Sequence, residues 1–436
     1  MKKTTVAMAV AGSLAAPAMA QTSNVQLYGR LNLGVDTYQA KGAAAGSNFD
    51  YENRVRIFDT ASRVGLRGTE DLGNGIRAIF QIETGVNVDS GNNFGQNGIQ
   101  NPNSGFWGSR DSWVGIEGDK FGRLTFGRQS VYWANGTIEQ FGANYINASS
   151  PLASYSQSGI VVGPVARESN TAQYSLRFGG FSGTASYGHS STAFGSQSPY
   201  ETFQTPTAAT PDPKDQFWGL TLRYNHAVFD LQADYAQRND VVNIQGRDSR
   251  GLKLGAAWKY MPGAQISVIY QEIKNDQVFG LGVASGVVAP CNTPGAAVIL
   301  PGVTAAALRT TGGGGSVNGC DNIKQDMWVL NWEHTFGNFQ VLAQYGFSND
   351  VKGSSSAAGL PDSGAQTYML GGRYLLSKRT WVYASWNRIS NDRNSYTDYW
   401  GAWVTSANQL GQAPGLPASS SGADPQIFAI GLFHQF

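Results

Sequence analysis

The sequence predicts an all-β fold in which sixteen antiparallel strands close into a transmembrane β-barrel. Three observations support this prediction: an apolar leader, apolar residues at every second position along many segments, and connections that alternate between short and long. A strand places successive side chains on opposite faces, so this period gives one apolar face toward lipid and one polar face toward a lumen. After the leader, no apolar run approaches the roughly 20 residues that a spanning helix needs, which excludes a helical membrane protein.

The N-terminal segment 1–20 is the predicted secretory signal peptide. Lys2 and Lys3 precede an apolar stretch over 5–16, and small residues close the segment. The stretch is shorter than the roughly 20 residues of a spanning helix, whereas the basic start and the small-residue end are typical of a cleavable leader. We therefore expect one barrel domain over 21–436.

Composition and charge exclude other classes of protein. Charged residues make up only 14% of the chain and aromatic residues 12%. Without Lys2 and Lys3, 29 of the 31 basic residues remain against 30 acidic ones, a formal net charge of −1. No excess of positive charge marks a nucleic-acid partner. The same kind of segment recurs from end to end, which favours a single architecture over several domains.

Alternation of apolar and polar residues defines the predicted strands. Segment 25–33 has apolar or small residues at its odd positions, and segments 229–235 and 252–260 repeat the pattern. A helix would scatter such residues around its circumference, whereas a strand gathers them on one face. The sixteen predicted strands are 24–37, 54–70, 76–88, 109–118, 123–129, 167–178, 181–190, 215–224, 229–239, 250–261, 264–275, 323–336, 339–350, 365–376, 380–391 and 425–436.

Seven short turns, most of them containing Gly, Asn or Pro, join these strands in pairs, because such residues supply the backbone angles of tight turns. The short turns lie at 71–75, 119–122, 179–180, 225–228, 262–263, 337–338 and 377–379, and longer polar stretches lie at 39–56, 89–108, 130–166, 191–214, 240–249, 276–322, 351–364 and 392–423. Short periplasmic turns and long extracellular loops are typical of outer-membrane barrels. A soluble β-sandwich is the alternative, but its apolar faces would be exposed to water. Sixteen strands enclose a lumen too wide for side chains to fill, so we expect it to hold water.

Three motifs and the last strand resemble one family. The motifs are Leu-Tyr-Gly-Arg at 27–30, the segment 62–73 and the segment 121–129, while the even positions of 428–436 form an apolar stripe that ends at Phe436. Together they resemble the general trimeric porins of Gram-negative bacteria, most closely the β-proteobacterial branch. The resemblance covers the whole mature chain in strand order.

This resemblance implies a function and a setting. A porin of this kind is a water-filled channel for passive diffusion of small hydrophilic solutes and ions. It forms a homotrimer in the outer membrane, in contact with lipid and lipopolysaccharide, and its third loop folds into the barrel. The terminal Phe436 is then the assembly signal.

The candidate functional residues are charged side chains at the narrowest part of the pore, where they set electrostatic barriers. Alternation directs Arg30 and Arg63 into the lumen, and Arg167 shares the lumen parity of its strand. Alternation places Arg128 on the lipid side, so we expect a bend or bulge where its strand enters the third loop. The resemblance also implies the inward direction. At roughly 3.3 Å per residue, Arg30, Arg63 and Arg128 reach similar mid-barrel levels, and Arg167 lies further up its strand. The four arginines fall on the first, second, fifth and sixth predicted strands, so they would form one basic wall.

The arginines have an alternative role as partners of wall carboxylates, because alternation also directs Glu83, Asp111 and Glu117 inward. Arg77 is inward too, but it lies close to a turn and ranks below the other arginines. The third loop resembles the loop that narrows these pores.

The acidic side of the predicted constriction is sparse. Before the Phe141-Gly142 pair the third loop offers only Glu139, with Gln140 where the family carries another acid. Several arginines against one glutamate predict a preference for anions.

Neither an enzyme nor a metal site is predicted. The four histidines are scattered, and no Gly-x-Ser-x-Gly motif occurs; we expect no catalytic residue, cofactor or metal. Cys291 and Cys320 lie in one long loop of a secreted chain, which favours a disulfide over two free thiols. A channel specific for a sugar or an organic anion remains the alternative function, and aromatic ladders along the pore would favour it.

Overall fold

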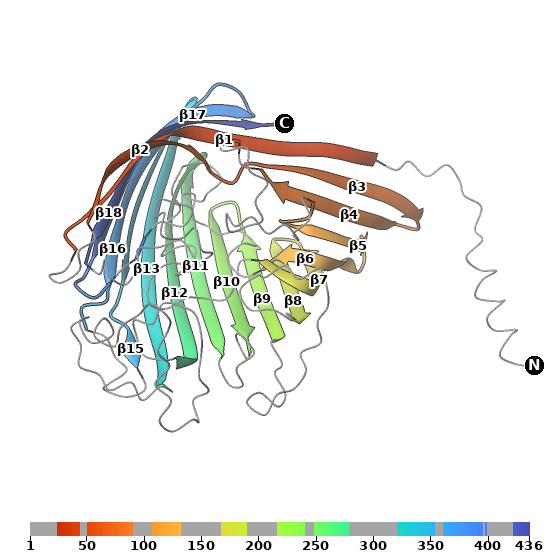
Figure 1. Ribbon diagram of the computed structural model, residues 1–436. Coiled ribbons are helices and arrows are strands. Elements are labelled where there is room, and N and C mark those ends of the chain that lie inside the picture. Colours follow the sequence, from red (N-terminus) through yellow and green to blue (C-terminus); the bar gives the residue numbers. More distant parts are fainter. Residues whose placement is uncertain are drawn as a thin grey trace, which may run out of the picture.

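A computed structural model describes residues 24–43, 50–86, 88–89, 107–131, 167–189, 216–239, 248–278, 321–353, 361–395, 397–398 and 422–436. The described part of the chain is built from strands, and it contains no helix long and apolar enough to cross a membrane. Figure 1 shows these strands as one curved wall that follows the order of the chain.

The strands have the following bounds: β1 (Asn24–Lys41), β2 (Tyr51–Asp59), β3 (Arg63–Gly73), β4 (Ile76–Gly85), β5 (Ser112–Gly118), β6 (Gly122–Ser130), β7 (Arg167–Phe178), β8 (Phe181–His189), β9 (Gln216–Asn225), β10 (Phe229–Arg238), β11 (Ser249–Met261), β12 (Ala264–Val278), β13 (Asp321–Phe336), β14 (Phe339–Ser348), β15 (Lys352–Gly353), β16 (Ala365–Leu375), β17 (Thr380–Asn391) and β18 (Asp424–Gln435).

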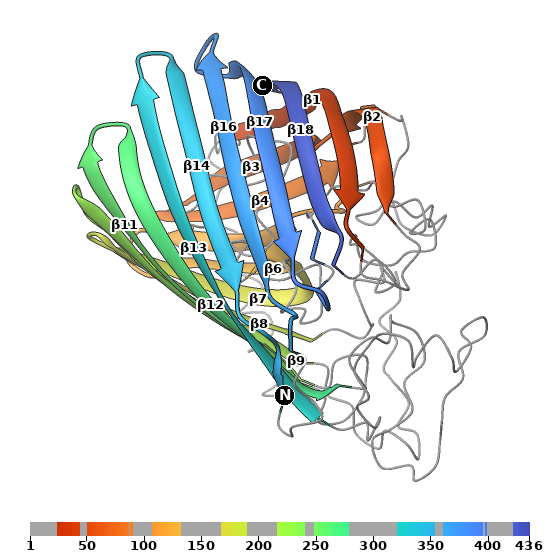
Figure 2. The same cartoon turned by 90° about the vertical axis from the view of Figure 1, so that its left-hand side faces the viewer.

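The sheet closes on itself, because the first strand pairs with the last. β1 is antiparallel to β18 from Arg30 opposite Gln435 to Lys41 opposite Asp424, and its other edge pairs with β2 and β3. The other strands pair with their neighbours in the chain, except that β2 and β3 do not pair with each other, β15 pairs with β13, and β14 pairs with β16 past β15. Figure 2 shows β14, β16, β17, β18 and β1 side by side across the closure. A closed antiparallel barrel leaves no open edge, as a membrane requires.

The eighteen strand segments form sixteen crossings of the wall, which confirms the predicted number. β2 and β3 lie end to end along β1, and β14 and the two-residue β15 lie along β13. The break between β2 and β3 centres on Ala61, whose φ is +56°. The backbone of Asn32 on β1 still finds partners at this break. The Thr60 amide donates to the Asn32 carbonyl oxygen (3.0 Å), and the Asn32 amide donates to Ser62 Oγ (2.9 Å).

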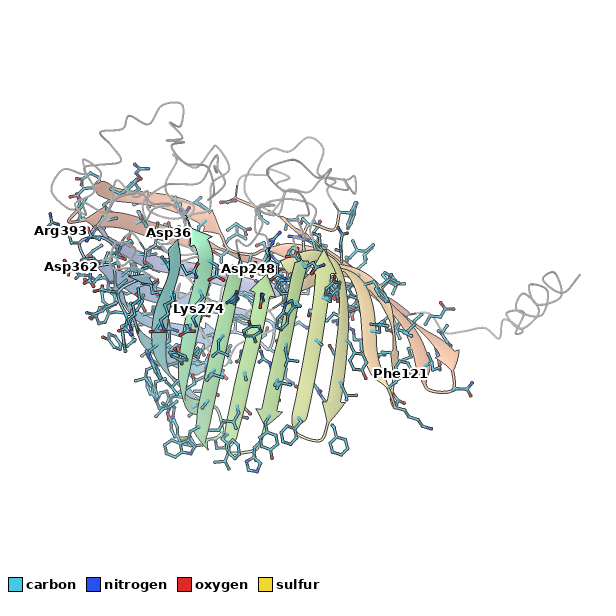
Figure 3. The ribbon with its side chains drawn as sticks, turned by 90° about the horizontal axis from the view of Figure 1, so that it is seen from below. Asp36, Phe121, Asp248, Lys274, Asp362 and Arg393 are labelled. Carbon is cyan, nitrogen blue, oxygen red and sulfur yellow. The ribbon has the colours of Figure 1, made fainter. Side chains whose placement is uncertain are left out.

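The seven predicted short turns all join adjacent antiparallel strands. In the β3–β4 turn Asn74 and Gly75 have φ values of +56° and +76°, a conformation that suits Asn and Gly. The strands are longer than predicted at the first loop, where β1 runs to Lys41 and β2 begins at Tyr51. In Figure 3 Phe121, in the β5–β6 turn, lies far from Asp362 and Arg393, which flank the long connections at the other end of the wall.

The outer face carries the apolar side chains that alternation predicted. On β18 Phe428, Ile430 and Leu432 are 47%, 57% and 49% exposed, in accordance with a face covered by lipid. Aromatic rings mark the short-turn end, where Phe178 and Phe181 flank the β7–β8 turn and are both exposed.

The inner face is not uniformly polar. Along β1, β2, β14 and β16–β18 it carries a packed apolar cluster, which we call the apolar side of the lumen. Trp381 and Phe433 stack there with centroids 3.8 Å apart and an interplanar angle of 9°. The Tyr383 hydroxyl donates to Asn32 Oδ1 at 2.6 Å, which satisfies a buried polar group among the apolar ones.

Candidate functional site

Charged side chains gather on the inner face of β3–β7 and in the segment just before β5. Pairing registers place Arg63 opposite Gly85, Ser112 opposite Arg128 and Ser130 opposite Arg167, so these strands bring the groups to one level of the wall. We call this group the arginine network: Arg63, Arg110, Arg128 and Arg167 around Glu83 and Asp111.

Glu83 is the first centre of the network. Arg110 Nε donates to its Oε1 at 2.7 Å, Arg63 Nε lies 3.4 Å from its Oε2, and the Tyr28 hydroxyl donates to the same Oε2 at 3.1 Å. The carboxylate side chain is only 6% exposed. Two hydrogen bonds and one ion pair therefore hold a buried carboxylate, and the bond from Arg110 has the short length typical of a charge-assisted hydrogen bond.

Asp111 is the second centre. Arg167 Nε donates to its Oδ1 at 2.9 Å, and the Ser130 hydroxyl lies 2.7 Å from both carboxylate oxygens. Gln81 Nε2 donates to the Asp111 carbonyl oxygen at 3.2 Å. This pairing links the segment before β5 to β4, β6 and β7, so it fixes that segment against the wall.

Arg128 enters the network through a bulge of the predicted kind. The β6–β7 register shifts between Gly127 and Gln129, and Gly127 has a φ of +143°. A Cβ at Gly127 would collide with the Ser112 carbonyl oxygen. Arg128 donates from Nε to the Ser109 carbonyl oxygen (3.2 Å) and from Nη1 to the Ser169 hydroxyl (2.8 Å), within electrostatic reach of the other charges of the network.

Arg30 adjoins the network from β1. It lies opposite Arg63 in the β1–β3 register and is 5% exposed. Its Nε donates to the Ala61 carbonyl oxygen at 2.9 Å, and its guanidinium lies 5.7 Å from the Phe433 ring centroid. The break between β2 and β3 thus supplies the acceptor, and Arg30 joins the charged side of the lumen to the apolar side.

The structure places Arg77 elsewhere. Its Nε donates to Glu117 at 3.0 Å and its Nη2 to Asp119 at 3.1 Å, next to the short turns. It lies six residues from Glu83 along β4, or roughly 20 Å. Glu139, Cys291 and Cys320 lie outside the described residues.

Sequence reasoning missed Arg110. Alternation would put Arg110 and Asp111 on opposite faces, but residues 107–111 are bends and turns before β5 begins at Ser112. A signal for it was nevertheless present, because alternation directs its partner Glu83 inward and a nearby arginine is a natural partner for such a carboxylate.

The network carries more positive than negative charge. Four arginines surround two carboxylates, a formal excess of two positive charges, and Arg30 raises it to three. Glu168 also lies near Arg128, but it pairs with Arg238 and leaves this excess unchanged. Glu83 and Asp111, which alternation also directed inward, thus neutralise part of the predicted basic wall, as the alternative role of its arginines anticipated. The remaining field still favours negative ions on this side of the lumen.

Phe436 lies at the closure of the barrel. Its amide donates to the Gly29 carbonyl oxygen and the Gly29 amide donates to its carbonyl oxygen, both at 3.1 Å. A Cβ at Gly29 would come within 2.5 Å of the Phe436 ring. The terminal aromatic residue is therefore seated over a glycine of the first strand.

A family model described as Gram-negative porin matches residues 4–394. The chain belongs to the Gram-negative porin family, whose barrels lie in the outer membrane. It is 38% identical over 158 residues to an outer membrane porin protein of Bordetella pertussis, a match that covers 33% of this chain and 38% of the relative. It is 34% identical over 197 residues to the major outer membrane protein P.IB of Neisseria gonorrhoeae, a match that covers 43% of this chain and 48% of the relative. The chain thus spans less than half the length of these curated relatives.

Solved structures share the fold over nearly the whole chain. The anion-selective porin from Comamonas acidovorans has a TM-score of 0.60 at 21% identity and covers 95% of this chain and 100% of its own. The trimer form of OmpT from Vibrio cholerae has a TM-score of 0.55 at 13% identity, and the match covers 95% of this chain and 99% of OmpT. At these identities the likeness shows the barrel fold alone.

Proposed function

We propose that the protein forms a water-filled channel for passive diffusion of small hydrophilic solutes and ions across the outer membrane, with a preference for anions. The observation that carries the preference is the positive excess of the arginine network. Charged groups lining a pore with low-dielectric walls concentrate ions of the opposite sign. Arg30, Arg63, Arg110, Arg128 and Arg167 are the proposed constriction residues.

The geometry supports diffusion rather than chemistry. Each network arginine is bonded to a carboxylate, a hydroxyl or a carbonyl oxygen, so the charges are held in place. A fixed field selects by charge without binding a solute tightly, which conduction requires. The anion selectivity of the Comamonas porin agrees with this proposal.

Reversal potentials in planar bilayers under a salt gradient test the preference. The double variant Arg63→Gln/Arg110→Gln removes both cations from Glu83 and cancels the excess of two, so we expect the anion preference to fall sharply. Arg388→Gln is the matched control, because Arg388 bonds Asp424 on the outer face. A wild-type channel that prefers cations would contradict the proposal.

Liposome swelling with solutes of graded size separates a general pore from a specific one. A general pore sorts solutes by size, and uptake rises in proportion to concentration. Saturable uptake of one sugar or organic anion would favour the specific channel instead.

We further infer a homotrimer in contact with lipid and lipopolysaccharide, because the sequence resembles the trimeric porins and a barrel of the same fold, OmpT from Vibrio cholerae, has a trimer form. Native mass spectrometry of the detergent-extracted protein measures the state directly. A monomer as the dominant species would contradict it.

Two further proposals concern residues in the long loops. Glu139 is the proposed acidic counterpart of the constriction, and Cys291 and Cys320 are proposed to form a disulfide. Peptide mapping without reduction tests the bridge. Two alkylated cysteines would overturn it.

A further inference from the structure

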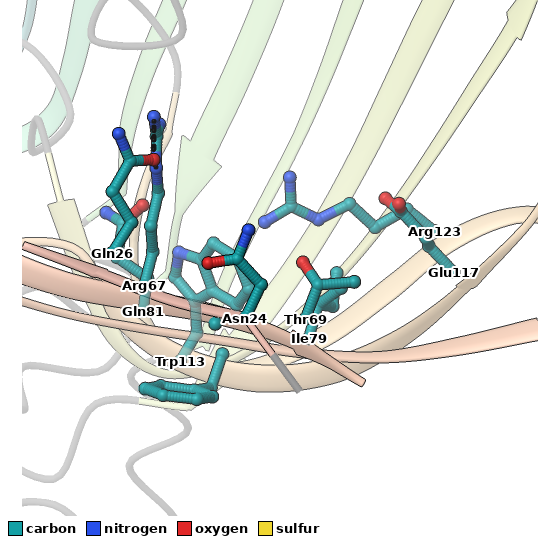
Figure 4. A pocket seen from close by; sticks show the side chains of 11 residues that line it. Asn24, Gln26, Arg67, Thr69, Ile79, Gln81, Trp113, Glu117 and Arg123 are labelled. Carbon is teal, nitrogen blue, oxygen red and sulfur yellow. Dashed lines mark hydrogen bonds between the residues drawn. The ribbon is translucent and has the colours of Figure 1, made fainter. Parts of the chain in front are cut away.

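A cavity of ≈ 280 Å³ lies between the arginine network and the short turns. Figure 4 shows its lining from β1, β3, β4, β5 and β6. Gln26, Arg67, Gln81 and Trp113 are successive neighbours in the pairing registers and form one row across it. Arg67 is four residues from Arg63 along β3, or roughly 13 Å, so the cavity is distinct from the network.

Arg123 is the unusual group in this cavity. Its guanidinium carbon lies 4.0 Å from the Trp113 ring centroid, and cation–π contact of this kind fixes its position. Among the residues that the structure describes, no side-chain or backbone acceptor receives a hydrogen bond from it. Because a ring rather than an acceptor holds the guanidinium, its N–H donors are open to an incoming anion.

Arg67 supplies a second guanidinium at the same level. Its Nε and Nη2 both donate to Gln26 Oε1, at 2.9 and 2.8 Å, and its guanidinium carbon lies 5.1 Å from the Tyr28 ring centroid. Arg67 and Trp113 are two strands apart, or roughly 10 Å. Two oriented guanidinium groups with Gln81 between them therefore face one cavity.

Positive charge exceeds negative charge at this cavity. Glu117, the acidic residue of the lining, lies opposite Arg123 in the β5–β6 register and accepts a hydrogen bond from Arg77 at 3.0 Å, and Arg77 also donates to Asp119. Three arginines, Arg67, Arg77 and Arg123, thus face two carboxylates, which leaves a formal excess of one positive charge. Asn24 and Thr69 add an amide and a hydroxyl that can donate to an oxyanion (Figure 4).

We propose that this cavity is an oxyanion-binding site, in which Arg123 and Arg67 bind the carboxylate or phosphate group of a permeating solute. The proposal rests on the proposed channel function and adds to it a binding site on the path of the solute. A carboxylate, a hydroxyl or a carbonyl oxygen holds each network arginine, whereas the Trp113 ring holds Arg123 and leaves its donors to a passing anion. Guanidinium groups match such oxyanions in a bidentate manner.

Inorganic phosphate and acetate, each compared with chloride, are the probes. We expect conductance in potassium phosphate and potassium acetate to saturate with concentration while conductance in potassium chloride stays linear. Arg123→Gln should weaken the apparent phosphate affinity about tenfold, because it removes charge-assisted hydrogen bonds. Arg388→Gln, on the outer face, is the control and should change neither the saturation of conductance nor the apparent phosphate affinity. Saturation by only one of the two oxyanions would identify which group the site takes.

Phosphate conductance that is linear in the wild type, or saturation that persists unchanged in both Arg123→Gln and Arg67→Gln, would overturn the site. Saturation lost only in Arg63→Gln would place binding in the network and also overturn it. Broadening of the ³¹P signal by detergent-solubilised protein gives a second measure that needs no conductance. Failure of the channel proposal is distinguishable, because the wild type would then conduct neither salt.

Discussion

Alternation directs side chains into the lumen on both sides of the barrel, but the two sides carry different kinds of residue. On β3–β7 the inward positions carry arginines and carboxylates, bonded to one another. On β1, β2, β14 and β16–β18 many of them carry rings and aliphatic groups that are almost fully buried, such as Trp381 and Phe433, beside a buried carboxylate, Asp36, that pairs with Arg56. The first side keeps charges fixed beside water, while the second fills space.

This contrast shows that inward direction and polarity are separate properties. A polar lumen is the usual partner of an apolar outer face. Here Ile427 and Phe433 are inward and fully or almost fully buried, while Phe428 and Leu432 on the same strand are outward. The pore that we propose therefore runs closer to the arginine side, and the apolar side acts as a rigid support.

Trp381→Ala tests the apolar side and should have the largest effect. Removing the buried ring that stacks on Phe433 should lower the free energy of unfolding by about 3–5 kcal/mol. Urea titration of the barrel in lipid vesicles measures it. Trp386→Ala, on the outer face of the same strand, should cost less than half as much. Equal losses for the two variants would mean that the inner cluster is not a core.

Gly127→Ala tests how the backbone delivers Arg128 to the arginine side. The added methyl group meets the Ser112 carbonyl oxygen at a φ that side chains rarely adopt, so we expect a loss of about 1–3 kcal/mol and a lower anion preference. Urea titration and the reversal potential give the two values. Gly183→Ala is the control, since its nearest neighbour would be an ordinary 3.5 Å away. Unchanged selectivity would show that Arg128 acts elsewhere.

Glu83→Gln should have the smallest effect on stability of the three variants. The direction in which it changes the anion preference tests the charge of the arginine network. It removes one negative charge from the network and leaves Arg63 and Arg110 in place, so the anion preference should rise. Asp424→Asn removes a carboxylate from the outer face and serves as the control. If the reversal potential moves toward cations in Glu83→Gln, the excess charge of the network is not what selects.

Alternation predicted much of the fold because it is a local property. The sixteen crossings, the seven turns and the outward stripe of β18 follow from period two and turn residues. The bulge at Gly127 followed from a conflict between alternation and the resemblance. The break at Ala61 could not be predicted, because alanine carries no turn signal and its positive φ depends on contacts with β1.

The partners of the site residues were harder to predict than their direction. Alternation turned Arg63 and Glu83 to one face, but the distance between two side chains depends on register and rotamer. Arg110 escaped prediction because no alternation operates in the turn before β5. The free donors of Arg123 likewise depend on its position over Trp113, a tertiary contact.

The seating of Phe436 over Gly29 bears on how the barrel is made. Arg30 pairs with Gln435, so the last hydrogen-bonded ladder joins positions roughly 400 residues apart in the chain. Local hairpins can form early at little entropic cost, whereas the pairing of β1 with β18 can form only after the intervening strands have paired. Until then β1 and β18 are two open edges, able to pair with another copy of the chain. We propose that the contact of the Phe436 ring with Gly29 favours the pairing of β18 with β1, and so shortens the time for which those edges stay exposed.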